Sequence, residues 1–182
     1  KLDQLIVAAF VSPNTLGIYS FLKQILNYPI SLLVAIYTQI TFPFYSRFKR
    51  QINKVKKMLF KGFVLLILIF STYAVVIFLL PNDVMNTYIS VWDMRNSLAF
   101  LVILFSLSRL CFECFATMSI AVGYIRQQLK INISYLVFVF FFGMLIPFIG
   151  LELYLLALSS IAFLFSIFIY LSTFNKLRKN VN

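Results

Sequence analysis

This sequence of 182 residues contains no histidine, only five acidic residues and two cysteines. Without histidine it lacks the side chain that most often serves as acid–base catalyst or zinc ligand, so we expect no metal site, no catalytic residue and no enzymatic activity. Cys111 and Cys114 lie in one apolar run without a second pair, and we interpret them as free thiols that pack as small hydrophobes. No GxxxxGK[ST] phosphate-binding loop is present, and we predict no cofactor.

Charge is also scarce, since charged residues make up 12% of the chain and hydrophobic residues 62%, with a mean hydropathy of +0.96. Soluble domains are about 25% charged and about 45–50% apolar. The 22 Phe and 10 Tyr are more than one soluble core could bury. These values exclude an ordinary soluble domain and indicate an integral membrane protein.

Long apolar runs divide the chain into candidate spans, each of the roughly 20 residues that a helix needs to cross a bilayer. The runs are continuous and do not alternate, which excludes a membrane β-barrel. We predict an all-α polytopic membrane helix bundle that forms a single transmembrane domain over residues 1–182, with five full spans and one partial span. The predicted spans are approximately 1–11 (partial), 17–42, 58–80, 98–122, 131–149 and 151–174.

The first run, Leu5 to Val11, stops at Ser12-Pro13-Asn14 and is too short to cross the membrane. We expect it to be the end of a truncated helix, so that the chain is the C-terminal part of a longer protein.

Basic residues gather in alternate connections between the predicted spans. The intervening connections contain only Arg95 as a base, beside Asp83, Asp93 and Glu152. The positive-inside rule therefore predicts a multi-pass protein of the cytoplasmic (inner) cell membrane with a cytoplasmic C-terminus. Because the net charge of +11 is spread over short loops, we expect no nucleic-acid partner. The basic residues of the predicted cytoplasmic side are Arg47, Lys49, Arg50, Lys54, Lys56, Lys57, Lys61, Arg126, Lys130, Lys176, Arg178 and Lys179.

Two predicted spans carry polar residues along one helical face. Arg109 and Glu113 stand near the middle of one span, where a charge costs about 2.5–3.5 kcal/mol on insertion scales. Such residues are candidates for a substrate or ion pathway, and we predict that these faces line a hydrated cavity. In the span 17–42 the polar residues are Ser20, Gln24, Asn27, Ser31 and Thr38; Lys23 flanks this face and Pro29 interrupts it. In the span 98–122 they are Ser106, Arg109, Glu113 and Thr117.

A packing role is the alternative for these polar residues. Arg109 and Glu113 are four residues apart and could pair on their own helix, and Ser, Thr and Asn often hydrogen-bond between helices. Against it, no acidic residue lies within helical reach of Lys23 along the sequence.

Residues 3–47 resemble the start of the second half of Wzx-like polysaccharide flippases of the multidrug/oligosaccharidyl-lipid/polysaccharide (MOP) superfamily. The shared features are an Asp that opens an apolar segment, a Leu-Gly-x-Tyr-Ser motif, a Pro-containing helix and a final Phe-Pro-x-x-Ser-Arg. Here they are Asp3, residues 16–20, Pro29 and residues 42–47. The chain is poorer in glycine than the family, with Ala8 and Ala9 where a Gly is common.

The resemblance implies a MATE/MOP-like fold in which this chain is the second six-helix bundle and the missing N-terminal half supplies the other wall of a central cavity. It implies flipping of a polyprenyl-pyrophosphate-linked oligosaccharide across the bilayer, with H⁺ or Na⁺ as coupling ion. Lys23 and Arg109 would bind the pyrophosphate, Glu113 would hold Arg109 or exchange with the ion, and Asp3 would pair with either base. Gln24, Asn27, Ser31 and Ser106 complete the predicted cavity lining.

Two other functions are open at this point. A MATE-type multidrug/cation antiporter needs unpaired carboxylates in its cavity, and the buried charges here, two basic and two acidic, are not predominantly acidic. The other is a membrane-embedded glycan polymerase or acyltransferase, or a non-catalytic scaffold. Such enzymes typically have a large outer loop or a catalytic histidine, which this sequence lacks.

Overall fold

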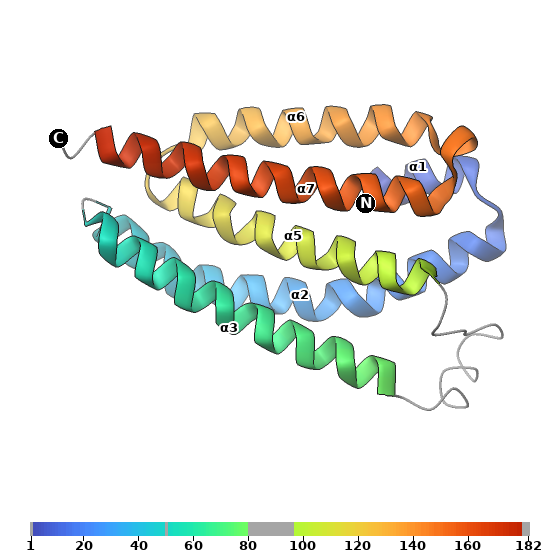
Figure 1. Ribbon diagram of the computed structural model, residues 1–182, viewed down its shortest axis with the longest axis horizontal. Coiled ribbons are helices and arrows are strands. Elements are labelled where there is room, and N and C mark those ends of the chain that lie inside the picture. The colour runs from blue at the N-terminus through green and yellow to red at the C-terminus, as the bar shows by residue number, and fades with distance from the viewer. Residues whose placement is uncertain (1, 50, 80–96, 180–182) are drawn as a thin grey trace.

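The computed structural model describes residues 2–49, 51–79 and 97–179, and these residues form helices joined by short turns, without a strand. The prediction of an all-helical membrane protein is confirmed. Figure 1 shows the helices aligned along one long axis, with α5 running through the middle of the bundle. The helices are α1 (Leu2–Phe10), α2 (Pro13–Arg47), α3 (Ile52–Leu79), α5 (Ser97–Ala121), α6 (Ile125–Met144) and α7 (Ile146–Lys179).

Among the described residues, four helices, α2, α3, α5 and α7, are long and apolar enough to cross a membrane, whereas five full spans were predicted. The predicted span 131–149 falls on α6, which begins at Ile125, so that Arg126 and Lys130 lie inside its first turns. Its apolar part, from 131 to 144, measures about 21 Å at 1.5 Å per residue, less than the ~30 Å hydrocarbon core.

The break between α1 and α2 follows from Ser12 and Pro13, as predicted. Ser12 caps α2 by accepting a hydrogen bond from the Thr15 amide at 3.4 Å, and Pro13 occupies the first helical turn, where no amide donor is needed. α2 therefore begins at residue 13, four residues before the predicted span, and continues through Pro43 to Arg47.

α6 ends with Leu145 as its C-cap, and the helical path is broken again at Gly150, where the sequence predicted the turn. Pro147 stands in the first turn of α7, which favours a helix start there. Gly150 has a non-helical backbone (φ 78°, ψ 165°), with a positive φ that L residues with a Cβ rarely adopt. The glycine thus separates the short first turn of α7, residues 146–149, from its long part, which follows Gly150.

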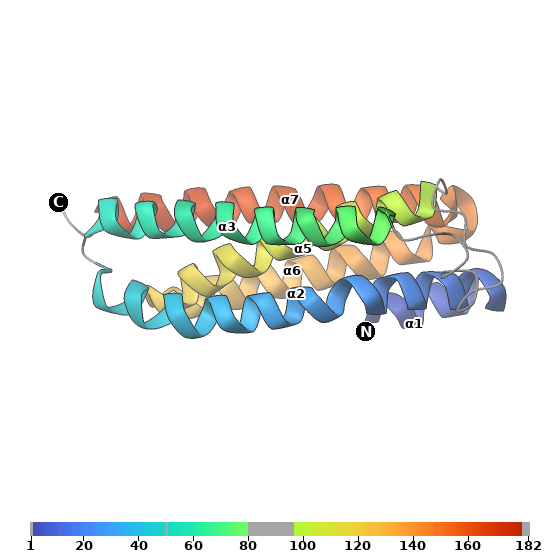
Figure 2. The same ribbon diagram turned by 90° about the horizontal axis from the view of Figure 1, so that it is seen from below.

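α5 forms the centre of the core because it contacts α2, α3, α6 and α7. Figure 2 shows α3 and α7 along one side of the bundle and α2 along the other, with α5 crossing between them. Val102 and Leu110 of α5 are buried with Leu26 of α2 and Leu158 of α7. On the outside, large apolar side chains remain exposed, as expected for helices that face lipid. Examples are Leu32, Leu65, Phe141, Phe148 and Leu164.

The carbonyl that Pro29 leaves without a helical donor has a specific hydrogen-bond partner. A proline cannot donate to the carbonyl four residues earlier, which here belongs to Ile25. The Tyr73 hydroxyl of α3 donates to the Ile25 carbonyl oxygen at 3.0 Å. A neighbouring helix therefore satisfies the carbonyl that Pro29 leaves free.

We predict that Tyr73→Phe lowers the free energy of unfolding by about 1 kcal/mol, since the Ile25 carbonyl loses its donor. Denaturation of the purified protein by increasing SDS fractions measures this loss. Tyr28→Phe is the matched control, because Tyr28 is an exposed tyrosine on the same α2 helix. Equal stability of the wild type and Tyr73→Phe would contradict the role given to this hydrogen bond.

Candidate functional site

Arg109 and Glu113 lie in one groove between α5, α6 and α7, with a cavity volume of about 330 Å³. The spacing of four residues puts both side chains on the same face of α5. α6 contributes Asn132 and Tyr135 to the same groove. We call this the Arg109 groove; its other lining residues are Phe105, Phe112, Ala116, Ile120, Leu136, Val139, Leu158 and Ala162.

The two charges of the groove do not neutralise each other directly. Within the described ranges, Arg109 and Glu113 form no ion pair with each other, although they are one helical turn apart. Arg109 is exposed and Glu113 is half-buried. The pairing alternative considered from the sequence is therefore not the arrangement found, and the guanidinium remains open to a ligand.

α6 supplies polar groups that the sequence analysis did not assign to the site. Asn132 accepts a hydrogen bond with Oδ1 from Gln128 Nε2 at 2.9 Å, which leaves its Nδ2 donor for other partners. The Tyr135 ring lies 5.3 Å from the Phe112 ring, centroid to centroid, so it is held against α5. The spacing of three residues between Asn132 and Tyr135 indicates that they share one face of α6. It does not indicate which helix that face packs against, so the sequence alone could not place them in the groove.

The polar residues of α2 do not all face one cavity. Gln24 and Ser31 are exposed, and the Ser31 hydroxyl donates to the Tyr28 carbonyl at 2.8 Å. Asn27 is half-buried, and its Oδ1 has no hydrogen-bond partner in the described part of the chain. Lys23 is buried, 3% exposed, with its Nζ 5.5 Å from the Tyr19 ring centroid. The structure thus does not bring Lys23 into the Arg109 groove.

Ser106 and Thr117 are on α5 but do not line the Arg109 groove. Ser106 is fully buried, and no hydrogen-bond partner for its hydroxyl lies within the described residues. Thr117 donates to the Glu113 carbonyl at 2.9 Å and lies 3.4 Å, oxygen to oxygen, from the Thr38 hydroxyl of α2. The polar faces of α2 and α5 therefore meet at this threonine pair. Asp3 lies in the first turn of α1, but its side chain is outside the described residues.

α5 separates α2 from α6, which do not contact each other in the part of the chain that the structure describes. α2 and α6 lie on either side of α5 (Figure 1). The Arg109 groove therefore follows the α6 side of α5, while the threonine pair marks its α2 side.

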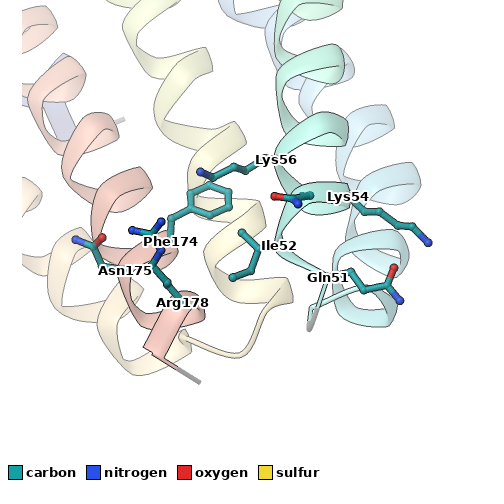
Figure 3. Close-up of a pocket in the computed structure, with 8 residues that line it drawn as sticks. Gln51, Ile52, Lys54, Lys56, Phe174, Asn175 and Arg178 are labelled. Atoms are coloured by element: carbon teal, nitrogen blue, oxygen red, sulfur yellow. The ribbon is translucent and has the colours of Figure 1, made fainter. Parts of the chain in front are cut away.

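Apart from Arg50 and the side chain of Lys179, which lie outside the described residues, the basic residues of the predicted cytoplasmic connections belong to one end of the bundle, where α3 and α6 begin and α2 and α7 end (Figure 1). A hollow of about 600 Å³ opens there between α3 and α7. Figure 3 shows Lys56 and Arg178 beside the buried Phe174 ring, whereas Lys54 points away from it. Lys56 Nζ lies 5.2 Å from the centroid of that ring. None of the predicted site residues lines this hollow.

The N-terminal half of the chain matches a known protein family. Residues 1–93, slightly more than half of the chain, match the family model described as polysaccharide biosynthesis protein. No curated protein and no solved structure matches the chain.

Proposed function

Because the chain belongs to the polysaccharide biosynthesis protein family, as residues 3–47 predicted, we propose that it flips a lipid-linked oligosaccharide across the cytoplasmic membrane. The cargo is an oligosaccharide repeat unit on a polyprenyl diphosphate, for the export of surface polysaccharide. The protein then acts as a transporter and not as an enzyme, since the repeat unit changes leaflet without change in its bonds.

The observation that carries this proposal is the depth of Arg109. It stands midway along α5, about 18 Å from either end at 1.5 Å per residue. Arg109 is exposed in the groove and forms no ion pair with Glu113. The free-energy cost of a charge at this depth is therefore not offset by an ion pair within the described residues. A guanidinium presents a fork of donors that suits phosphate oxygens. The diphosphate of the cargo is the anion that Arg109 would stabilise during passage.

The rest of the groove suits the sugars. Asn132 and Tyr135 offer amide and hydroxyl groups to sugar hydroxyls, and their apolar neighbours form a surface on which pyranose rings can lie. The polyprenyl tail stays in the lipid. A second bundle would cover the open side of Arg109 and supply the other wall of the cavity, as in the MATE/MOP-like arrangement.

Glu113 is the group through which an ion gradient would act. It is half-buried next to Arg109 and can exchange between the guanidinium and a bound H⁺ or Na⁺. The same carboxylate is the observation in favour of the second candidate, a MATE-type cation antiporter. Altered drug sensitivity with unaltered surface glycan, on deletion of the gene, would support the antiporter.

The orientation follows from the basic end of the bundle. We assign this end and the C-terminus to the cytoplasm, so that cargo enters from the side of Arg47 and Lys176.

The function is tested in a strain from which the gene is deleted. We expect the lipid-linked oligosaccharide to accumulate in the cytoplasmic leaflet and the surface polysaccharide to be lost, because synthesis continues while translocation stops. Extraction of the membrane pool and its accessibility to a membrane-impermeant glycan probe on each face measure both effects. An unaltered pool with normal surface polysaccharide would rule out the flippase.

A further inference from the structure

A second groove runs between α6 and α7, with a cavity volume of about 640 Å³. Its residues change in character along the helices. Towards the basic end they are polar, and away from it they are apolar. We call it the α6–α7 groove; its polar residues are Gln127, Lys130, Ser134, Ser172 and Lys176, and its apolar residues are Ile131, Phe138, Leu164, Phe165 and Phe168.

The polar part of the groove is built around Lys176. Its Nζ donates to Gln127 Oε1 at 2.6 Å and lies 5.4 Å from the centroid of the Tyr124 ring. Gln127 in turn donates from Nε2 to the Ser172 hydroxyl at 2.5 Å. An ammonium group has three donors, so Lys176 is held in position with donors left for a ligand. Lys130 adds a second exposed cation from α6.

Charge in the groove has one sign, because none of its lining residues is acidic. The ligand that complements two lysines at the cytoplasmic boundary of a membrane is an anion, and phosphate head groups are the abundant anions there. A free phosphate would need only the lysines, so the apolar part of the groove decides between a soluble anion and a lipid.

The whole groove, with its polar and apolar parts together, has about the length of one leaflet. The Phe138 and Phe165 rings pack edge to face, 5.8 Å between centroids, and form part of its floor. Leu164 and Phe168 are 66% and 56% exposed along its side. From Lys176 back to Leu164 is about 18 Å at 1.5 Å per residue, close to half of the ~30 Å hydrocarbon core.

We propose that the α6–α7 groove binds one anionic glycerophospholipid of the cytoplasmic leaflet. The phosphate lies between Lys130 and Lys176, and an acyl chain follows the apolar part past Phe138 and Phe168. This lipid is a resident partner and not the transported cargo, since the Arg109 groove is a separate cavity that shares no lining residue with it.

The test uses the purified full-length protein in phosphatidylcholine nanodiscs, titrated with phosphatidylglycerol and analysed by native mass spectrometry. We expect the wild type to retain phosphatidylglycerol in preference to phosphatidylcholine. The double variant Lys130→Gln/Lys176→Gln should weaken retention roughly tenfold or more, because two cationic contacts at the membrane surface are lost. Lys57→Gln is the control, since Lys57 is an exposed lysine of α3 outside the groove, and it should leave retention unchanged.

A second variant tests the apolar part with both lysines in place. Ser134 is exposed in the groove, and Ser134→Trp should fill it and also reduce phosphatidylglycerol retention at least severalfold. Retention of phosphatidylglycerol no greater than that of phosphatidylcholine would overturn the proposal. So would competition by glycerol 3-phosphate at the same concentration as the lipid, which would identify a site for the phosphate alone. Displacement by polyprenyl diphosphate in preference to phosphatidylglycerol would also overturn it, because the groove would then belong to the transport route.

Discussion

Arg109→Gln is expected to lower oligosaccharide export at least tenfold while the protein still reaches the membrane. The variant removes the guanidinium from the groove and leaves a shorter, uncharged polar side chain. Charge-assisted hydrogen bonds contribute about 1.5–3 kcal/mol each, which corresponds to roughly a tenfold to hundredfold change in rate if the contact is made during passage. Because Arg109 is exposed and not part of the core, its loss should not unfold the bundle.

The measurement is the rate of appearance of surface polysaccharide after the variant is induced in the deletion strain, divided by the amount of protein in the membrane. Arg109→Lys should retain part of the rate, since lysine keeps the charge but not the fork geometry. The matched control is Arg126→Gln, which removes an exposed arginine at the start of α6. If Arg109→Gln exported as fast as Arg126→Gln, Arg109 would have no part in binding the cargo.

Gly62→Val is expected to lower the free energy of unfolding by about 1–3 kcal/mol, through overpacking at the contact of α3 with α2. A Cβ on Gly62 would lie 2.7 Å from Cε2 of Tyr37. The Tyr37 ring has little room to move, because it is buried and its hydroxyl is hydrogen-bonded to that of Tyr45 at 2.6 Å. The clash must therefore push α3 away from α2 or break the tyrosine pair.

Thermal unfolding of the purified variants in the same detergent measures this effect. Gly17→Val is the control, since a Cβ there meets no atom within 4 Å. Replacing the ring in the double variant Gly62→Val/Tyr37→Leu should recover part of the loss, because the smaller side chain opens space. A Gly62→Val protein as stable as Gly17→Val would show that the two helices do not approach so closely.

Much of the helix pattern could be predicted from local sequence, and the differences have identifiable causes. The α1–α2 break was predictable because Ser12 and Pro13 act within one turn of it. The break at Gly150 was predictable as well, because a glycine readily adopts the positive φ that interrupts a helix. The partner of Pro29 could not be predicted, because Tyr73 is far away in sequence and only tertiary packing brings it to Ile25.

Some residues of the candidate site could also be predicted from the sequence, and others could not. Arg109 and Glu113 were predictable because a charge in an apolar run is costly and a spacing of four residues defines one face. Asn132 and Tyr135 were not, because their place depends on how α6 packs against α5. The periodicity of α2 grouped Lys23 with Gln24, yet one is buried and the other exposed. Adjacent residues on a helix point about 100° apart, so neighbours of a polar face need not share its surroundings.

The most direct test of the account is translocation by the purified full-length protein in proteoliposomes. Lipid-linked oligosaccharide would be incorporated, and the fraction that becomes accessible to an impermeant glycan-modifying probe followed with time under an imposed H⁺ or Na⁺ gradient. The account predicts translocation that exceeds protein-free liposomes, falls at least tenfold with Arg109→Gln and is unchanged with Arg126→Gln. Translocation equal to that of protein-free liposomes, or equal in wild type and Arg109→Gln, would contradict it.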